Sequence, residues 1–153
     1  MRRLLCSLVC TVLIAAPNSA EAATGRVVKV LPHFLDLQGR HALSPSLYDR
    51  DAYQAQLRKS PAQRSGLRFD IQWRAQGAKE KLKLRVELRG TAKGDLPRST
   101  TLESALEPGR KRAGWFPVKL AGEDYKNFGE VTAWRVTLWD GEQLVGEQKS
   151  FLW

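Results

Sequence analysis

Two stretches in the middle of the chain alternate strictly between apolar and polar residues. Residues 66–73 and residues 81–89 each carry one apolar set, and the two sets are Leu67, Phe69, Ile71 and Trp73, and Leu82, Leu84, Val86 and Leu88. A period of two residues is typical of a β-strand that buries one face. Because residues 75–80 include Gly77 and can form a loop, we predict that the two strands make an antiparallel hairpin.

The charged residues on the other side of these strands favour one register of the hairpin. That register sets the following residues opposite one another: Arg74 and Lys81, Asp70 and Arg85, Arg68 and Glu87. Opposite charges that face each other across an antiparallel ladder stabilise it, and so do the apolar pairs on the other face.

Proline marks two further strands as candidates for sheet edges. Arg26–Leu31 is rich in β-branched residues and is followed by Pro32, after which Phe34–Leu37 continues the strand. Gly114–Ala121 contains Pro117. Since proline has no N–H to give to a neighbouring strand, we predict edge positions for both segments.

The end of the chain predicts a second hairpin. Glu130–Trp139 alternates, Asp140-Gly141 is a strong turn signal, and Gln143–Trp153 returns as the last strand. Two registers stay open, because a two-residue loop sets Thr137 opposite Leu144 and a three-residue loop sets Leu138 opposite Leu144.

A helix is predicted over Leu47–Lys59, after the dipeptide Ser44-Pro45. Serine caps the free amides of a helix start, and proline is tolerated in the first turn. Acidic side chains lie early in this segment and basic ones late, which suits the helix dipole. Ser60-Pro61 ends it. In contrast, Gly122–Gly129 is predicted to be a loop, and Ser99–Leu106 a short strand.

Residues 1–22 have the features of a cleavable signal peptide. Arg2 and Arg3 precede an uncharged run over Leu4–Ala16, and Ala20-Glu21-Ala22 has small residues at the cleavage positions. The run is shorter than the roughly 20 residues of a membrane-spanning helix. We therefore expect export to the periplasm, the cell surface or the medium. The two cysteines, Cys6 and Cys10, lie in this segment, so residues 23–153 form a single cysteine-free domain without disulfides.

About seven strands, with one helix between the first two, predict an all-β, antiparallel two-sheet sandwich. Trp73 and the closing stretch 133–141, which holds Trp134, resemble immunoglobulin-like and fibronectin-III-like sandwiches that place aromatic residues at such core positions. The cysteine pair of antibody domains is absent, so the chain is similar to cystine-free sandwiches of uncharacterised bacterial exported proteins. The resemblance covers residues 66–153 and 26–31, and it implies that residues 33–64 are an insertion. It implies binding or scaffolding rather than a particular activity.

The chain is strongly basic, with a formal net charge of +9. We predict that the densest basic cluster lies on one strand face, with loop residues extending it; the cluster is Arg74, Lys79, Lys81, Lys83, Arg85 and Arg89, and the extension is Lys93, Arg110, Lys111 and Arg112. Two interpretations stay open. The cluster docks a polyanion or an acidic partner, or it is the solvated face of a sheet that Asp70 and Glu87 partly neutralise.

The residues that could carry chemistry are few. His33, Asp36 and His41 form the only grouping of histidines with a carboxylate, and their spacing matches no metal-ligand motif. There is no Gly-x-Ser-x-Gly elbow, and the following acids are interpreted as strand-end and loop residues: Glu103, Glu107, Glu123 and Asp124. We therefore predict a protein without a cofactor, a metal or an enzymatic activity.

The leading functional hypothesis is an exported, non-enzymatic binding or scaffolding module. It would dock a protein of the bacterial envelope through a sheet face or through an edge strand. Four aromatic residues do not fall on the alternating positions that the pattern assigns to the core: Trp115, Trp139, Phe151 and Trp153. The alternative is therefore a module that binds carbohydrate or anionic glycan through Trp115, Trp139 and the basic cluster, and an enzyme comes third. Nucleic acid is disfavoured, because Phe69 and Trp73 point away from the basic side chains. The oligomeric state stays open.

Overall fold

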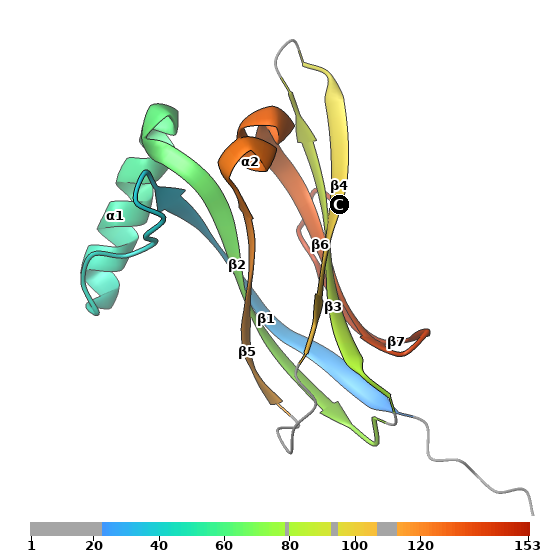
Figure 1. Cartoon of the computed structure of the whole chain (residues 1–153). Coiled ribbons are helices and arrows are strands. Elements are labelled where there is room, and N and C mark those ends of the chain that lie inside the picture. The colour runs from blue at the N-terminus through green and yellow to red at the C-terminus, as the bar shows by residue number, and fades with distance from the viewer. Residues whose placement is uncertain (1–22, 79, 93–94, 107–112) are drawn as a thin grey trace, which may run out of the picture.

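The computed structural model describes residues 23–78, 80–92, 95–106 and 113–153 (Figure 1). The predicted signal peptide, residues 1–22, lies outside the described residues. The elements of the described chain are β1 (Thr24–Asp36), α1 (Leu47–Lys59), a 3-10 turn (Pro61–Gln63), β2 (Arg64–Gln76), β3 (Leu82–Thr91), β4 (Pro97–Ala105), β5 (Ala113–Ala121), α2 (Gly122–Phe128), β6 (Glu130–Asp140) and β7 (Gln143–Lys149). Within these residues, no helix has the length and apolar character to cross a membrane.

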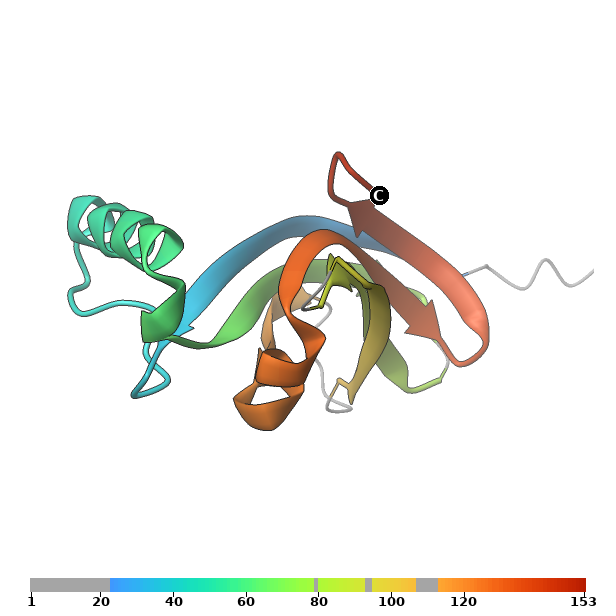
Figure 2. The same cartoon turned by 90° about the horizontal axis from the view of Figure 1, so that it is seen from above.

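The strands form two antiparallel sheets that pack face to face. One sheet has the order β1-β2-β5 and the other has the order β4-β3-β6-β7, and Figure 2 shows their two layers from above. The inward residues of both sheets make the core, with Phe69 and Ile71 meeting Leu84, Val86, Val136 and Leu138. The prediction of an all-β, antiparallel sandwich is confirmed, and so are the edge positions of β1 and β5.

The predicted hairpin between the two alternating strands is wrong. The strand β2 lies between β1 and β5, whereas β3 lies between β4 and β6 in the other sheet. The apolar faces of β2 and β3 therefore meet across the core instead of lying side by side. The opposite-charge pairs change accordingly, because Arg85 now faces Glu103 and Glu87 faces Arg135. Alternation alone does not distinguish a hairpin from a chain that crosses between two sheets.

The C-terminal hairpin forms, in a register that differs from both predictions. Asp140 lies opposite Gln143, Trp139 opposite Leu144, and Leu138 opposite Gly146. The turn is therefore made by residues 141 and 142, and Gly141 takes the positive φ of 56° that glycine tolerates. A bulge in β7 directly after the turn shifts the rest of the pairing.

Two elements near the ends of strands differ in how well the sequence predicted them. The helix α1 has the predicted range, with Arg58 and Lys59 in the last turn. The capping serine is Ser46 and not the predicted Ser44, because Ser46 accepts the N–H of Asp49 at 3.4 Å. The segment predicted to be a loop after β5 is the short helix α2. Tyr125 and Phe128, three residues apart on one side of this helix, pack against the core. Gly129, at a φ of 86°, ends the helix.

The strand β1 is longer than predicted and positions α1 at its end. It runs through Pro32, which lies opposite Phe69, and its pairing with β2 is irregular at two other places, between Val27 and Lys29 and between Leu35 and Asp36. The side chain of Gln54 accepts the N–H of Phe34 at 2.8 Å and donates to its carbonyl at 3.0 Å. These bonds hold α1 against the far half of β1, and Figure 1 shows this half curving away from β6 and β7.

Candidate functional site

The predicted basic cluster does not exist as one surface. Arg74 lies in the three-stranded sheet, whereas Lys83, Arg85 and Arg89 lie on β3 in the other sheet. Glu103 forms ion pairs with Arg85 at 2.7 Å and with Lys83 at 3.4 Å. Lys81 precedes β3 and is exposed. Lys79, Lys93, Arg110, Lys111 and Arg112 lie outside the described residues. The β3 face is thus largely neutralised by its own neighbours.

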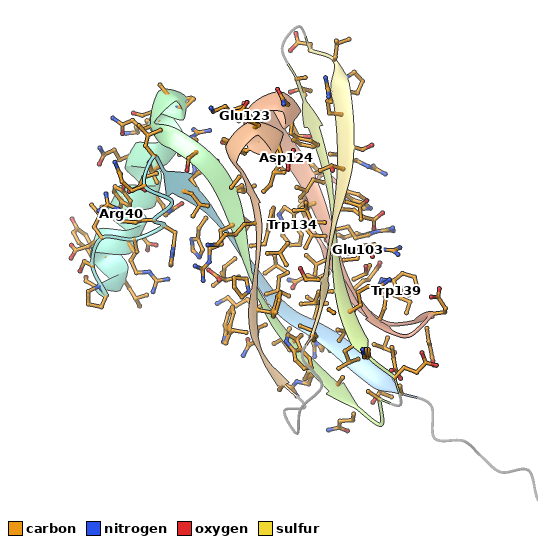
Figure 3. All side chains as sticks on the ribbon, viewed as in Figure 1. Arg40, Glu103, Glu123, Asp124, Trp134 and Trp139 are labelled. Atoms are coloured by element: carbon orange, nitrogen blue, oxygen red, sulfur yellow. The ribbon has the colours of Figure 1, made fainter. Side chains whose placement is uncertain are left out.

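Arginine side chains cover two of the predicted contact tryptophans on the outer side of the four-stranded sheet. The guanidinium of Arg85 lies 4.9 Å from the centre of the Trp139 ring, and that of Arg89 lies 4.0 Å from Trp153. Trp139 also donates its indole N–H to Thr137 at 2.8 Å. Figure 3 shows Trp139 on this outer side, whereas Trp134 lies between the sheets. Trp115 is different, because it is 51% exposed and lies on the three-stranded sheet.

The two histidines come together, but without the predicted carboxylate. The ring centres of His33 and His41 are 5.5 Å apart, and His33 Nε2 is 3.7 Å from Asp70 Oδ2, beyond hydrogen-bond distance. Burial lowers the pKa of both histidines, and for His41 the nearby Arg68 lowers the pKa further. The predicted carboxylate, Asp36, lies at the end of β1 and accepts a hydrogen bond from Arg40 instead. No group of three or more metal-ligating side chains is found within the described parts of the chain.

Asp36 has a structural role at the junction of β1 and α1. Its carboxylate accepts hydrogen bonds from the Tyr53 hydroxyl at 2.7 Å and from Arg40 Nε at 2.9 Å. Burial raises the pKa of this carboxyl, but the bonds from Tyr53, Arg40 and Gln38 outweigh burial and lower the pKa to about 2. Asp36 is therefore ionised at neutral pH and ties the loop after β1 to the helix.

The outer side of the three-stranded sheet carries a second basic surface, which we call the basic face. It consists of Arg26, Lys29, Arg68, Arg74 and Lys119. In the register of the sheet, Arg26 lies opposite Arg74 and Arg68 lies opposite Lys119. The acid that faces them is Asp70, and Arg68 already bonds it at 2.7 Å. The sequence signal for this face is that Trp115, Pro117 and Lys119 occupy alternate positions on one side of β5. The basic face itself forms only because β5 pairs with β2.

A cleft opens between the two sheets where the far half of β1 curves away. This cleft, which we call the β1–β6 cleft, has a volume of about 350 Å³. Its apolar wall comes from both sheets and from α2: Pro32, Phe34, Leu67, Tyr125, Val131 and Trp134. Its polar residues are Arg58, Arg64, Glu130, Thr132 and Ser150. Sequence reasoning missed the cleft, because it treated residues 122–129 as a loop and continued the last strand to residue 153.

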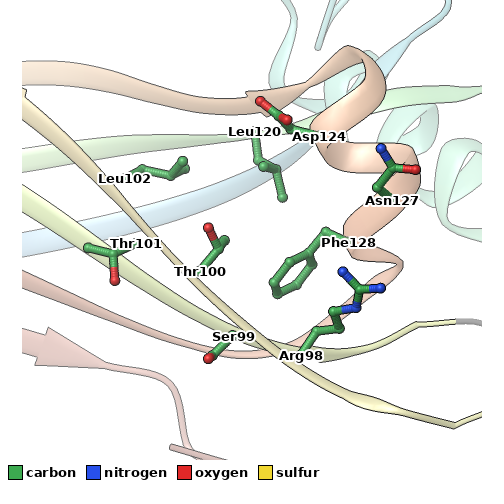
Figure 4. A pocket seen from close by; sticks show the side chains of 9 residues that line it. All are labelled: Arg98, Ser99, Thr100, Thr101, Leu102, Leu120, Asp124, Asn127 and Phe128. Atoms are coloured by element: carbon green, nitrogen blue, oxygen red, sulfur yellow. The ribbon is translucent and has the colours of Figure 1, made fainter.

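A further pocket, of about 390 Å³, lies between β4 and α2. Arg98, Thr100, Asp124 and Asn127 surround an apolar floor in this pocket, as Figure 4 shows. Arg98, Asp124 and Asn127 are exposed to water. No second carboxylate accompanies Asp124 among the described residues of the lining, so the pocket gives no support for general acid–base chemistry.

Comparison of the chain with protein-family models, with curated proteins and with solved structures finds no match. The functional argument therefore rests on the geometry of the cleft and of the basic face.

Proposed function

We propose that the protein is an exported, non-enzymatic binding module of the bacterial envelope, which docks an extended segment of a partner protein in the β1–β6 cleft. We also propose that its sandwich is fibronectin-III-like, with the segment that holds α1 as an insertion. The strand order supports this proposal. The set β1-β2-β5 and the set β3-β6-β7 match the A-B-E and C-F-G sets of immunoglobulin-like sandwiches, with β4 joined to β3.

The observation that carries the proposal is the uncovered edge of β6. The strand β7 pairs with β6 only from Asp140 back to Arg135. The next contact with β6 is made by Ser150, which donates its N–H to the carbonyl of Trp134 at 2.9 Å. Beyond this point, residues 130–133 of β6 have no described strand on that side. Exposed strand edges carry backbone groups that pair readily with a strand from another chain.

The cleft lies directly beside this edge and is lined by core side chains. Phe34 and Leu67 form one wall, and Val131 and Trp134 form the other. A strand added along residues 130–133 would insert alternate side chains between these walls, because the side chains of a strand point to opposite faces with a period of two. Backbone pairing supplies affinity in this mode of recognition, and the pockets supply specificity.

The charges at the mouth of the cleft favour an acidic partner. Arg64 lies 4.0 Å above the Phe34 ring and is held there by a 2.6 Å bond to the carbonyl of Leu57. Arg58 is exposed and forms no ion pair with another described residue, whereas Glu130 is the acid at this mouth. With a net charge of +9 on the chain, we expect a partner strand that alternates apolar residues with Asp or Glu.

Selection of a random peptide library on the purified protein tests this function. We expect the enriched peptides to alternate apolar and acidic residues. The variant Thr132→Trp, which fills the cleft, should weaken the binding of such a peptide at least about tenfold. The matched control is Glu142→Trp, because Glu142 is exposed in the turn between β6 and β7 and should leave peptide affinity unchanged.

Two results would overturn the proposal. One is a set of selected peptides without the alternating pattern. The other is a peptide whose affinity is the same for Thr132→Trp and for the wild-type protein. Circular dichroism of both variants establishes that the sandwich is retained, so that a loss of binding reports on the cleft.

A further inference from the structure

We propose that the basic face of the three-stranded sheet is a second, separate binding site, and that its ligand is a linear anionic glycan. The site is independent of the β1–β6 cleft, because its residues point outward from β1, β2 and β5. It also differs from the basic cluster predicted from the sequence, since Arg74 is the only residue that the two share.

The charge arrangement on this face is unfavourable for folding alone. Arg26 faces Arg74, and Arg68 faces Lys119 in the ladder. Like charges directly opposite each other destabilise a sheet. In the other sheet, Arg85 faces Glu103 and Glu87 faces Arg135, so its outer side is stabilised by pairs of opposite charge. The outer side of that sheet has one like-charge pair, Arg135 opposite Lys149, but Arg135 also bonds Glu87 at 2.7 Å. Arg26 and Arg74 have no such acid among the described residues. Broken local rules are typical of functional sites, and a bound anion would relieve the repulsion between these two arginines.

Four of the five cations of this face are free to bind a ligand, the exception being Arg68, which bonds Asp70. Arg26, Lys29, Arg74 and Lys119 form no ion pair with another described residue, and Lys29 and Lys119 are exposed. The residues from Arg68 to Arg74 span about 20 Å along β2, given the rise of a strand. The face can therefore contact several charged units of one chain at a time.

Trp115 gives the face an aromatic platform between its cations. It is 51% exposed and lies opposite Gln72, one step along the outer face from Arg74. A tryptophan ring offers a large, rigid apolar surface at low cost in conformational entropy. A ring of this kind stacks on the C–H face of a sugar, while Gln72 offers hydrogen bonds to its hydroxyls.

The same features argue against other polyanions. Single-stranded nucleic acid is bound by several aromatic side chains that stack successive bases. Trp115 is the one Trp, Tyr or Phe residue on the outer side of β1, β2 and β5, and the ring of His33, opposite Arg68, is partly buried beside the ring of His41. An anionic membrane would be met by a row of apolar side chains that insert among the acyl chains, whereas the neighbours of Trp115 on this face are Gln72, Pro117 and charged groups.

Titration of the protein with oligogalacturonate, a linear chain of uronic acids, tests this inference. Neutral dextran, oligothymidylate and vesicles with anionic lipid are the comparison ligands. We expect oligogalacturonate to bind most tightly. The double variant Arg74→Gln/Lys119→Gln should lose about tenfold in affinity, and Trp115→Ala should lose a similar factor that persists at high salt. Trp115→Phe should restore most of that loss.

A charge-matched control separates this site from the general basicity of the protein. Lys81→Gln/Lys149→Gln removes the same charge from exposed positions outside the basic face and should change the affinity less than about twofold. Equal losses in the two double variants would overturn the proposal. So would tighter binding of oligothymidylate or vesicles, or unchanged affinity in Trp115→Ala. Thr132→Trp should leave glycan affinity unchanged, so the two proposals fail separately.

Discussion

Trp134 and Ser150 exchange two hydrogen bonds at the point where the last strand leaves its neighbour. The N–H of Trp134 donates to Ser150 Oγ at 3.0 Å, and the N–H of Ser150 donates to the Trp134 carbonyl at 2.9 Å. The chain then turns, so that Trp153 lies under Arg89 and Arg135 on the outer side of the sheet. This pair therefore ends β7 and leaves the first residues of β6 beside the open cleft.

Removing the hydroxyl of Ser150 should destabilise the protein. In Ser150→Ala the Trp134 N–H loses its acceptor, which costs about 1 kcal/mol for a partly buried group. Urea denaturation followed by tryptophan fluorescence measures this loss. Ser99→Ala, on the exposed strand β4, is the control and should change stability little. Equal stability of the two variants would show that the Ser150 side chain does not hold the end of β7.

Acid should destabilise the protein in part through Asp36. Its pKa is about 2 in the folded protein, below its ordinary value. The ionised form is therefore favoured by folding, and its contribution is complete above about pH 5 and lost as the pH falls toward 2. We expect a contribution of about 1–2 kcal/mol. Urea midpoints measured from pH 6 to pH 2 should fall less steeply for Asp36→Asn, which is less stable at neutral pH. A parallel pH profile for the two proteins would contradict this.

His33 and His41 should add a second, milder step of pH dependence. Burial lowers the pKa of both rings below the ordinary value, so the unfolded chain binds protons more readily and stability falls as the pH drops below about 6.5. The groups that face the rings are Asp70, which favours protonation, and Arg50, Arg68 and Lys119, which oppose it. His33→Gln/His41→Gln should remove the step. Ring proton shifts followed by NMR should give both pKa values below that of a histidine peptide; values above it would contradict the account.

Gly129 should be intolerant of a side chain. Its φ of 86° is unfavourable for other residues, and a Cβ there would meet the Thr91 carbonyl and the Ala92 Cα. We expect Gly129→Ala to lose about 1–3 kcal/mol of stability. Gly114→Ala is the control, because a Cβ there meets only Trp73 at ordinary contact distance. Similar urea midpoints for the two variants would show that the corner between α2 and β6 relaxes freely.

The sequence predicted individual elements far better than it predicted their neighbours. The alternation in 66–73 and the helix-start signal at Ser44-Pro45 are local, so β2 and α1 could be identified from them, although the serine that caps α1 is Ser46. Whether β2 pairs with β3 depends on which sheet each strand joins, and this is decided by the packing of two apolar faces across the core. The alternation of residues is the same in both arrangements, so the predicted pairing of Asp70 with Arg85 was wrong.

The candidate sites were harder to predict for the same reason. The basic face needs β1, β2 and β5 side by side, although Arg26 and Lys119 lie far apart in the sequence. The cleft needs an early end to β7, which follows from the side-chain bond of Ser150 rather than from any break in hydrophobicity. Tyr125 and Phe128, three residues apart, were the available signal for α2, the helix that closes one end of the cleft.

Hydrogen–deuterium exchange of the β6 amides tests the central claim most directly. The protein is compared alone and with a saturating alternating peptide taken from the library selection. We predict that the cleft-facing amides of residues 130–133 exchange rapidly in the free protein and become protected when the peptide pairs with them, while the amides of β4 exchange unchanged. Protection confined to β4 or β5, or none at residues 130–133, would contradict strand addition at the β1–β6 cleft.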